Sequence, residues 1–456
     1  MSVSIALEDG LATAQRRHAM LGVALAVLLS VLDYAVVNVA LPTIAESIHC
    51  TDSAAIWVIN SYQLVSLIAL LPVAAMGDRI GHARMCRIGL ALFVFASALC
   101  ALSRSLPELA AARAVQGLGA ACILGVNAAL LRYIYPARML GRAVALNGLI
   151  IGLGVALGPT IAAAVLAVAS WPFLFYINLP LGAAALWFAF TALPATPRLL
   201  RAFDYLSTLL LACAIGPLII GGDRFAHASS PVLSVALIGF GSVSLLLLFL
   251  RQLGRTAPLL PVDLLARGGF AAAFFTSFTG FVASNFFIIS MPFALMGVLH
   301  RGPVATGLLI TPWPVAIIVV APFVGQLADR YPAAWLSSIG LCITATGFLL
   351  LRTMPANPDD FAIAWRIFVA GAGFGLFQPP NNKAMLTTAP LTRTSGASGM
   401  ISVSRLLGQT VGGMLVALTL GLVHPAPTRT CLSLAAATAL LAAIISVTRP
   451  RGTSAA

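Results

Sequence analysis

The chain has 456 residues, of which 60% are hydrophobic and only 9% are charged, and its formal net charge is +13. Soluble domains carry about 25% charged residues, so this composition excludes an ordinary soluble protein and indicates a membrane protein. The positive charge does not indicate nucleic-acid binding, because the basic residues lie between apolar runs and form no single patch or stripe.

Taken in chain order, the hydropathy predicts fourteen membrane-spanning helices, since a helix needs about 20 apolar residues to cross a bilayer. The stretch before residue 19 is polar and has no apolar core, so we expect a short cytoplasmic tail rather than a cleaved signal. The expected spans are 19–41, 54–76, 85–103, 107–131, 140–168, 171–193, 203–222, 231–250, 270–298, 304–328, 334–352, 359–386, 396–423 and 428–447.

The loops between these spans differ in charge. Of the 26 Lys and Arg residues, 18 fall on one side of the predicted arrangement, 5 on the other and 3 inside spans. Because Lys and Arg are enriched in cytoplasmic loops, we expect both termini to lie in the cytoplasm.

The chain also contains a repeat. The stretch "GDRIGHAR" at 77–84 has a counterpart in "GQLADRYP" at 325–332, and Arg113, inside the fourth span, has one in Arg366, inside the twelfth. Two parallel six-helix halves are a known layout of secondary transporters. The predicted division is a tail at 1–18, a six-helix bundle at 19–193, a linker with two extra helices at 194–269, a second bundle at 270–447 and a tail at 448–456.

Four stretches carry a family resemblance. They are "LDYAVVNVALPTIA" at 32–45, "GDRIGHAR", "RAVQGLGAA" at 113–121, and "GLGVALGP" at 152–159 followed by "WPFLFYINLPLG" at 171–182. In this order they resemble the fourteen-span drug:proton antiporter branch of the major facilitator superfamily, over essentially the whole chain. The resemblance implies an all-α polytopic fold of two six-helix bundles around a central cavity, with two inserted helices. Two departures are Ala74 and the pair Ala162–Ala163, where the family usually has Gly.

Asp33 is the only acidic residue well inside a predicted span. Burial in an apolar environment favours the neutral form of a carboxylate, so such a group can take a proton on one side of the membrane and release it on the other. We expect Asp33 to carry the proton; the alternative is a permanent structural ion pair. A charge at mid-membrane such as Arg113 usually faces the protein interior. The resemblance assigns Arg113 to the proton relay, and the alternative is an arginine capped by backbone carbonyls.

The loop motif is expected to form a cytoplasmic gate. Glycine lets the chain reverse with a positive φ, and Asp78 can pair with an arginine or a helix N-terminus of the other bundle. In the resembled family this contact latches the cytoplasmic side; the alternative is a solvated turn. The gate residues are Gly77, Asp78, Arg79, Gly81 and Arg84, with Gly325, Asp329 and Arg330 in the second copy.

Two further sets of residues complete the expected site. Gly154 and Gly158 have a spacing that lets two helices approach closely, and Pro159 can bend the helix; in the family this seam is typical of exporters and lies between the halves. The cavity should be mostly apolar with a few polar anchors, although Phe side chains in such helices more often face the core or lipid. The expected lining residues are Tyr34, Asn38, Gln116, Phe278, Phe281, Asn285, Arg366, Phe377 and Gln378.

The predicted function is proton-coupled antiport that exports amphipathic or lipophilic, often cationic, small molecules by alternating access, as in multidrug efflux. A dedicated exporter of one metabolite and a proton symporter stay open as alternatives. A membrane enzyme is disfavoured because the six His are scattered and no HExxH motif is present. The expected partners are drugs or metabolites, protons and the lipid bilayer, with no nucleic acid, metal or cofactor. We expect a monomer in the bacterial cytoplasmic (inner) membrane.

Overall fold

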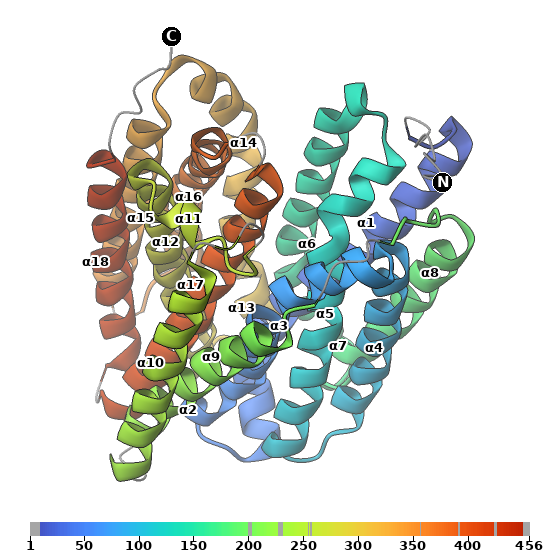
Figure 1. Cartoon of the computed structure of the whole chain (residues 1–456). Helices are drawn as coiled ribbons and strands as arrows, with labels where there is room; N and C mark the ends of the chain where they lie inside the picture. Colours follow the sequence, from blue (N-terminus) through green and yellow to red (C-terminus); the bar gives the residue numbers. More distant parts are fainter. Residues whose placement is uncertain are drawn as a thin grey trace, which may run out of the picture.

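The regular structure of the chain is entirely helical. The computed structural model describes residues 10–198, 203–226, 231–253, 255, 258–355, 357–390, 393–423 and 426–449, and within these ranges it contains no β-strand. In this part of the chain, fourteen segments are long and apolar enough to cross a membrane. The predicted all-α polytopic class and the number of spans are therefore confirmed (Figure 1).

The helices follow one another with short connections. The first group comprises α1 (Thr13–Ile48), α2 (Asp52–Ala55), α3 (Trp57–Ile80), α4 (His82–Leu102), α5 (Leu106–Ile134), η1 (Ala137–Met139), α6 (Leu140–Val168), α7 (Phe173–Tyr176) and α8 (Asn178–Thr191). Between the groups lie α9 (Tyr205–Ala226), α10 (Pro231–Gln252) and α11 (Val262–Leu265). The second group comprises α12 (Gly268–Phe293), η2 (Ala294–Val298), α13 (Pro303–Ile310), α14 (Pro312–Arg330), α15 (Ala333–Arg352), α16 (Asp360–Thr388), α17 (Thr394–Leu422) and α18 (Pro427–Val447).

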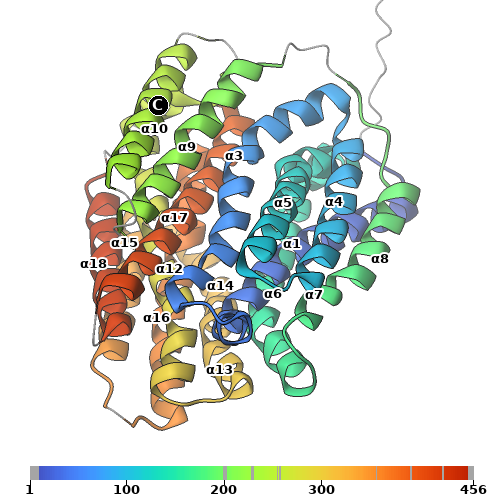
Figure 2. The ribbon, with the colours of Figure 1, turned by 90° about the horizontal axis from the view of Figure 1, so that it is seen from below.

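The two groups pack mainly within themselves. In the first, α1 lies against α6 and α8, and α5 lies between α3 and α4. In the second, α12 packs on α17 and α18, and α16 packs on α14 and α15. Contacts between the groups join α3 to α17, α6 to α13 and α1 to α12. The helices α9 and α10 form a pair along one edge of the molecule, beside α17 and α3 (Figure 2).

The first helix begins earlier than expected. We predicted a polar tail up to residue 18, but α1 starts at Thr13. Arg16 explains the extension, because its Nη2 donates to Thr13 Oγ1 at 2.9 Å and its Nη1 lies 3.1 Å from Met139 Sδ. Its guanidinium also lies over the Tyr135 ring. These contacts attach the polar end of α1 to the connection between α5 and α6.

Large apolar side chains stay exposed on the outer helices. Trp187, Phe240, Leu246 and Phe361 are each more than half exposed. Soluble monomers rarely expose so much apolar surface, and side chains of this kind suit contact with lipid tails. The buried polar side chains lie instead between the helices.

A carboxylate connects α9 to α10. Asp204 accepts hydrogen bonds from the Ser207 backbone N–H (3.1 Å) and hydroxyl (2.6 Å), from Arg251 (3.2 Å) and from Arg255. Partial burial raises the pKa of Asp204, but the hydrogen bonds from Ser207 and the two guanidinium groups outweigh this effect, and the pKa lies below its ordinary value. The charged form of Asp204 therefore stabilises this helix pair.

Candidate functional site

Glycines of the fourth-span motif bring α5 close to its neighbours. A Cβ at Gly117 would fall 2.3 Å from the Tyr62 carbonyl oxygen of α3, and one at Gly119 would fall 2.8 Å from the Phe93 nitrogen of α4. Neither position has room for a side chain. This close packing directs Arg113 and Gln116, earlier on α5, into the interior of the first group, where both are fully buried.

Asp33 and Arg113 form an ion pair inside the first group. Arg113 Nη1 donates to Asp33 Oδ2, and the two side chains are 0% and 1% exposed for Arg113 and Asp33, respectively. The helices α1 and α5 thus bring together Asp33 and Arg113, the residue that the family resemblance assigns to the proton relay. Removing one partner of such a pair would leave an uncompensated buried charge, which costs several kcal/mol, about 3–5 in typical cases.

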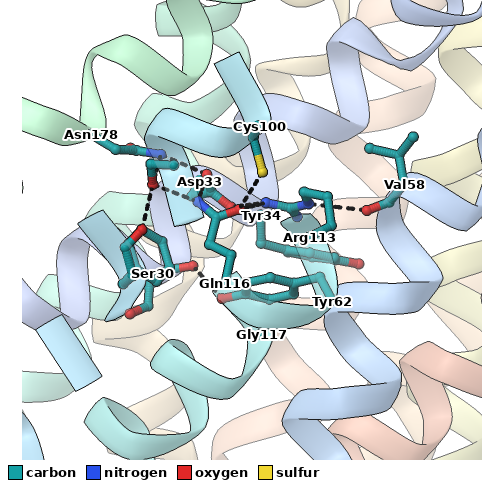
Figure 3. A network of polar contacts seen from close by, with 12 residues as sticks. Ser30, Asp33, Tyr34, Val58, Tyr62, Cys100, Arg113, Gln116, Gly117 and Asn178 are labelled. Carbon is teal, nitrogen blue, oxygen red and sulfur yellow. Dashed lines mark hydrogen bonds and ion pairs between the residues drawn. The ribbon is translucent and has the colours of Figure 1, made fainter. Parts of the chain in front are cut away.

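The second oxygen of Asp33 is also satisfied. Asp33 Oδ1 accepts from Asn178 Nδ2 at 2.7 Å and from Gln116 Nε2 at 2.9 Å. Ser97 Oγ lies 2.8 Å from Gln116 Nε2 and 3.4 Å from Asn178 Nδ2. An ionised carboxylate is an acceptor only, so this arrangement suits the charged form of Asp33 (Figure 3).

Arg113 is held from several sides. Its Nε donates to the Val58 carbonyl oxygen at 3.0 Å, and its Nη1 also lies 2.5 Å from Gln116 Oε1. Its guanidinium carbon lies 4.4 Å from the centre of the Tyr62 ring, in a cation–π contact. Its Nη2 is buried and has no hydrogen-bond acceptor within the described part of the chain. The carbonyl cap that we considered as an alternative is therefore present in addition to the ion pair.

The present packing matches one charge state of this pair. The Asp33 carboxylate accepts hydrogen bonds from three donors, the side chains of Arg113, Gln116 and Asn178. A neutral carboxyl group would not balance the charge of Arg113 and would have less acceptor capacity for these donors.

Three of the expected cavity residues meet between the two groups of helices. The Tyr34 hydroxyl of α1 donates to Asn285 Oδ1 of α12 at 3.1 Å, and Asn285 Nδ2 lies 2.5 Å from the Gln409 carbonyl oxygen of α17. Asn38 Nδ2 donates to the Tyr34 carbonyl oxygen at 2.7 Å. Phe278, which lies seven residues before Asn285 on α12, is only partly buried.

Other expected cavity residues lie elsewhere. Phe281 and Phe377 are buried in the core of the second group, where both contact the Phe374 ring at 5.4 Å between centroids. Arg366 donates to the Ala362 carbonyl oxygen of its own helix at 2.6 Å and lies over the Trp365 ring. Gln116 belongs to the Asp33 network, and Gln378 is partly buried on α16.

The loop motif forms the expected turn. Gly81 has a φ of +102° between α3 and α4, a conformation that favours glycine. Gly77 is helical, and a Cβ there would fall 2.8 Å from Val126 of α5. Asp78 Oδ1 lies 3.2 Å from His82 Nε2 in the same group of helices. Arg79 donates to the Tyr205 hydroxyl at 3.3 Å, and Arg84 is exposed.

The second copy of the loop differs from the first. Gly325 is helical and has nothing within 4 Å of the position of a Cβ. Arg330 is exposed. The side chain of Asp329 lies outside the part of the chain that the structure describes. The two copies therefore share a sequence pattern but not the close packing of the first glycine.

The residues Gly154, Gly158 and Pro159, here called the exporter motif, lie on α6, which packs on the helix that carries Asp33. A Cβ at Gly154 would fall 3.1 Å from Val31 Cγ1, and one at Gly158 would fall 2.3 Å from Ala35 Cβ. These glycines thus face α1 of the same group, whereas the resemblance placed this seam between the halves. The other face of α6 meets the second group, where a Cβ at Gly307 of α13 would fall 2.6 Å from the Pro159 carbonyl oxygen.

The two groups of helices are joined unevenly. Ser53 donates to the Ala417 carbonyl oxygen at 2.8 Å, and the hydroxyls of Thr160 and Thr311 lie 3.2 Å apart. The groups diverge toward the end of the molecule that bears the two termini (Figure 1).

Several contributors to the site were not predicted. Asn178 and Ser97 complete the Asp33 network, and Arg405 of α17 interacts electrostatically with Tyr34 and Tyr62. Asn178 belongs to the quoted stretch at 171–182, and Arg405 is one of three arginines inside predicted spans, so both could have been identified from the sequence. Nothing in the sequence distinguishes Ser97 as part of the site. Within the described residues, no group of three or more His, Cys, Asp or Glu could hold a metal ion.

Comparison with known proteins assigns the family. The model of the Major Facilitator Superfamily matches residues 23–253 and 270–456. The chain belongs to this superfamily. It is therefore a multi-pass membrane transporter, and the enzyme alternative is excluded by this assignment.

Relatives within the superfamily cover most of the chain. The uncharacterized transporter YebQ of Escherichia coli (strain K12) is 44% identical over 452 residues, which cover 97% of this chain and 98% of that protein. The multidrug resistance protein Stp of Mycobacterium tuberculosis is 30% identical over 386 residues, which cover 84% of this chain and 71% of that protein. The resemblance to a drug-efflux branch of the superfamily is thus confirmed.

Solved structures agree on the fold. The crystal structure of a POT family transporter in complex with a thioalcohol-conjugated peptide aligns with a TM-score of 0.73 at 13% sequence identity, over 94% of each chain. At this identity the likeness establishes the fold of the chain and nothing about its substrate.

Proposed function

We propose that this transporter is a proton-coupled antiporter that exports amphipathic or lipophilic small molecules by alternating access. The observation that carries the proposal is the buried pair of Asp33 and Arg113, whose carboxylate has its two oxygens satisfied by three side chains. Ionisable residues inside a membrane are costly and usually mark ion pathways or proton relays. The multidrug resistance protein Stp, which is 30% identical, supports export of small molecules.

Asp33 would carry the proton in this scheme. In the present state its carboxylate is balanced by Arg113, so a proton binds productively only when the helices around α1 rearrange. The exporter glycines Gly154 and Gly158 support this role, because they press α6 against the part of α1 that contains Asp33. A movement of α6 against α13 would therefore reach the proton site through direct packing.

We further propose that the termini face the cytoplasm of a bacterial cell, in its cytoplasmic membrane, and that the transporter acts as a monomer without a cofactor. The excess of basic residues on the terminal side supports this orientation. With this orientation, the divergence of the two helix groups corresponds to an inward-facing state. The pairing of Asp78 with His82, within its own group, agrees with a cytoplasmic gate that is open.

Everted membrane vesicles test this function. Vesicles with an acidic interior, which report their pH gradient by acridine orange fluorescence, are given a panel of dyes and antibiotics. Antiport predicts that a transported compound drives protons out of the vesicle and accumulates inside, and that an uncoupler abolishes the accumulation. Proton flow in the same direction as the compound would indicate a symporter, and movement of one metabolite alone would indicate a dedicated exporter. Neither compound nor proton movement, with the protein present in the membrane, would refute the proposal.

A further inference from the structure

An arginine of the second group lies at the boundary between the two groups without a counter-charge. Arg405 lies in the interior of α17 and is partly accessible. It interacts electrostatically with the hydroxyls of Tyr34 and Tyr62, which are on α1 and α3 of the first group. Within the described part of the chain, Arg405 makes no hydrogen bond and no ion pair.

The polar groups near Arg405 include further unused hydrogen-bonding capacity. Gln63 follows Tyr62 on α3 and is 1% exposed, yet neither its Nε2 nor its Oε1 has a hydrogen-bond partner among the described residues. Gln63 lies beside the Tyr34 hydroxyl. Buried polar groups are normally hydrogen-bonded. The Gln63 amide and the Arg405 guanidinium, which both lie near the Tyr34 hydroxyl, therefore indicate a position for a polar group that the chain itself does not supply.

The charges in the interior of the membrane do not balance. Asp33 is the only carboxylate well inside a predicted span, and Arg113 already neutralises it at direct hydrogen-bond distance. Arg405 therefore adds one net positive charge close to the site. An isolated charge in such an environment is costly unless it is paired. A negatively charged group would supply the missing partner.

We propose that Arg405 binds the carboxylate of the substrate, so that the exported molecules are amphipathic organic acids rather than cations. This inference rests on the proposed export function and specifies its substrate class. A guanidinium presents a planar fork of donors that matches a carboxylate in a two-point contact. Gln63 Nε2 supplies a further donor, and the partly buried Phe278 of α12 lies beside Gly408, one helical turn from Arg405 on α17. The apolar part of an amphipathic acid would pack there.

The proposal also has an electrical consequence. Exchange of one inward proton for one outward anion moves two positive charges into the cell, whereas exchange for a monovalent cation moves none. A negative membrane potential therefore drives export of an acid and leaves one-for-one export of a cation unaffected.

The test compares matched compounds in cells that lack their own efflux pumps. The acids are fusidate, deoxycholate and nalidixate; the neutral compounds are their methyl esters; the permanent cation is tetraphenylphosphonium. We expect the wild-type protein to protect cells from the acids. Arg405→Gln should reduce this protection about tenfold or more, because a charge-assisted contact is lost, and Arg405→Lys should retain part of it. The matched control is Arg352→Gln, which also removes one arginine from a membrane helix, at the exposed end of α15, and should retain protection.

Each outcome separates the two proposals. Protection from esters or tetraphenylphosphonium but not from acids would overturn the acid specificity and leave the export function standing. Unchanged export of acids by Arg405→Gln would also overturn it. No protection from any compound, with the wild-type protein present in the membrane, would refute the export function itself. Fluorescence-detected size exclusion of each variant establishes that it is folded.

Discussion

Gly158 of α6 lies directly against Ala35 of α1, and Ala35 follows Asp33 by two positions in the sequence. A Cβ on the glycine would fall 2.3 Å from the Ala35 Cβ and 3.1 Å from its carbonyl carbon. The nearest atoms belong to the backbone and to the short side chain of Ala35, so a methyl group at position 158 would fit only if α1 and α6 moved apart. Gly158 therefore contacts the helix that carries Asp33 within one group of helices, and α6 connects this contact to α13 of the other group.

We expect Gly158→Ala to reduce stability by about 1–3 kcal/mol, the usual cost of overpacking. Efflux should fall by more than the decrease in the amount of folded protein explains. The matched control is Gly152→Ala on the same helix, where a Cβ would meet nothing within 4 Å. Thermal unfolding in nanodiscs and efflux rates per folded molecule measure the two effects. Equal behaviour of the two variants would contradict the role of the contact.

The sequence predicts the membrane spans well because a bilayer imposes a length and composition that few other structures satisfy. Asp33 and Arg113 could be identified for the same reason, since a charge inside an apolar run is rare. The hydrogen bond from Asn178 to Asp33 could not be predicted, because it joins residues 145 positions apart. The burial of Phe281 and Phe377 in the core could not be predicted, because a helix that is apolar all round gives no indication of which face it buries.

The orientation can be measured at two exposed loop residues. We expect a single cysteine at Arg104, between α4 and α5, to react with an impermeant maleimide in intact cells, and one at Arg138, between α5 and α6, to react only in everted vesicles. Both residues are exposed. The measurement requires a background in which the seven native cysteines are replaced. The reverse pattern would place the termini outside.

The cytoplasmic gate gives a separate prediction. Asp78 pairs with His82 in the present state, so a latch to the other group would form only when the cytoplasmic side closes. We expect Asp78→Asn to leave the protein folded, to slow transport, and to increase labelling of a cysteine introduced at Leu71 on α3, because the closed state loses a charge contact.

The control for this prediction is His82→Gln, which removes only the local pair. It should slow transport less than Asp78→Asn. If the two variants are equally slow and labelling at position 71 is unchanged in both, Asp78 only orders its own turn and the latch is absent.

The pair of helices α9 and α10 should respond to acid. The folded protein holds the pKa of Asp204 below its ordinary value of 3.8, so the unfolded chain binds this proton more strongly. The stabilisation is therefore present above the unfolded pKa and is lost as the pH falls through the folded pKa. Asp204→Asn should lower the melting temperature at neutral pH, and the difference from wild type should shrink below pH 3.8. A difference that stays constant with pH would show that the charge is unimportant.

Asp33 itself gives the most direct test of coupling. In Asp33→Asn the side chain cannot ionise, and the membrane potential, which is worth about 2.3 kcal/mol per charge per 100 mV, can no longer act on a proton at this site. We expect this variant to lose uphill transport driven by a pH gradient. It should retain exchange of labelled for unlabelled substrate, which needs the helices to alternate but needs no proton. Asp33→Glu should retain part of the uphill transport with a shifted pH dependence.

The variant also leaves Arg113 buried without its counter-charge, which can destabilise the fold. The double variant Asp33→Asn with Arg113→Gln removes both charges, so it separates loss of coupling from loss of folding. We expect it to be better folded than Asp33→Asn and equally uncoupled. If Asp33→Asn vesicles still exchange protons for substrate at the wild-type rate, the proton binds elsewhere, and the pair of Asp33 and Arg113 serves only to hold α1 against α5.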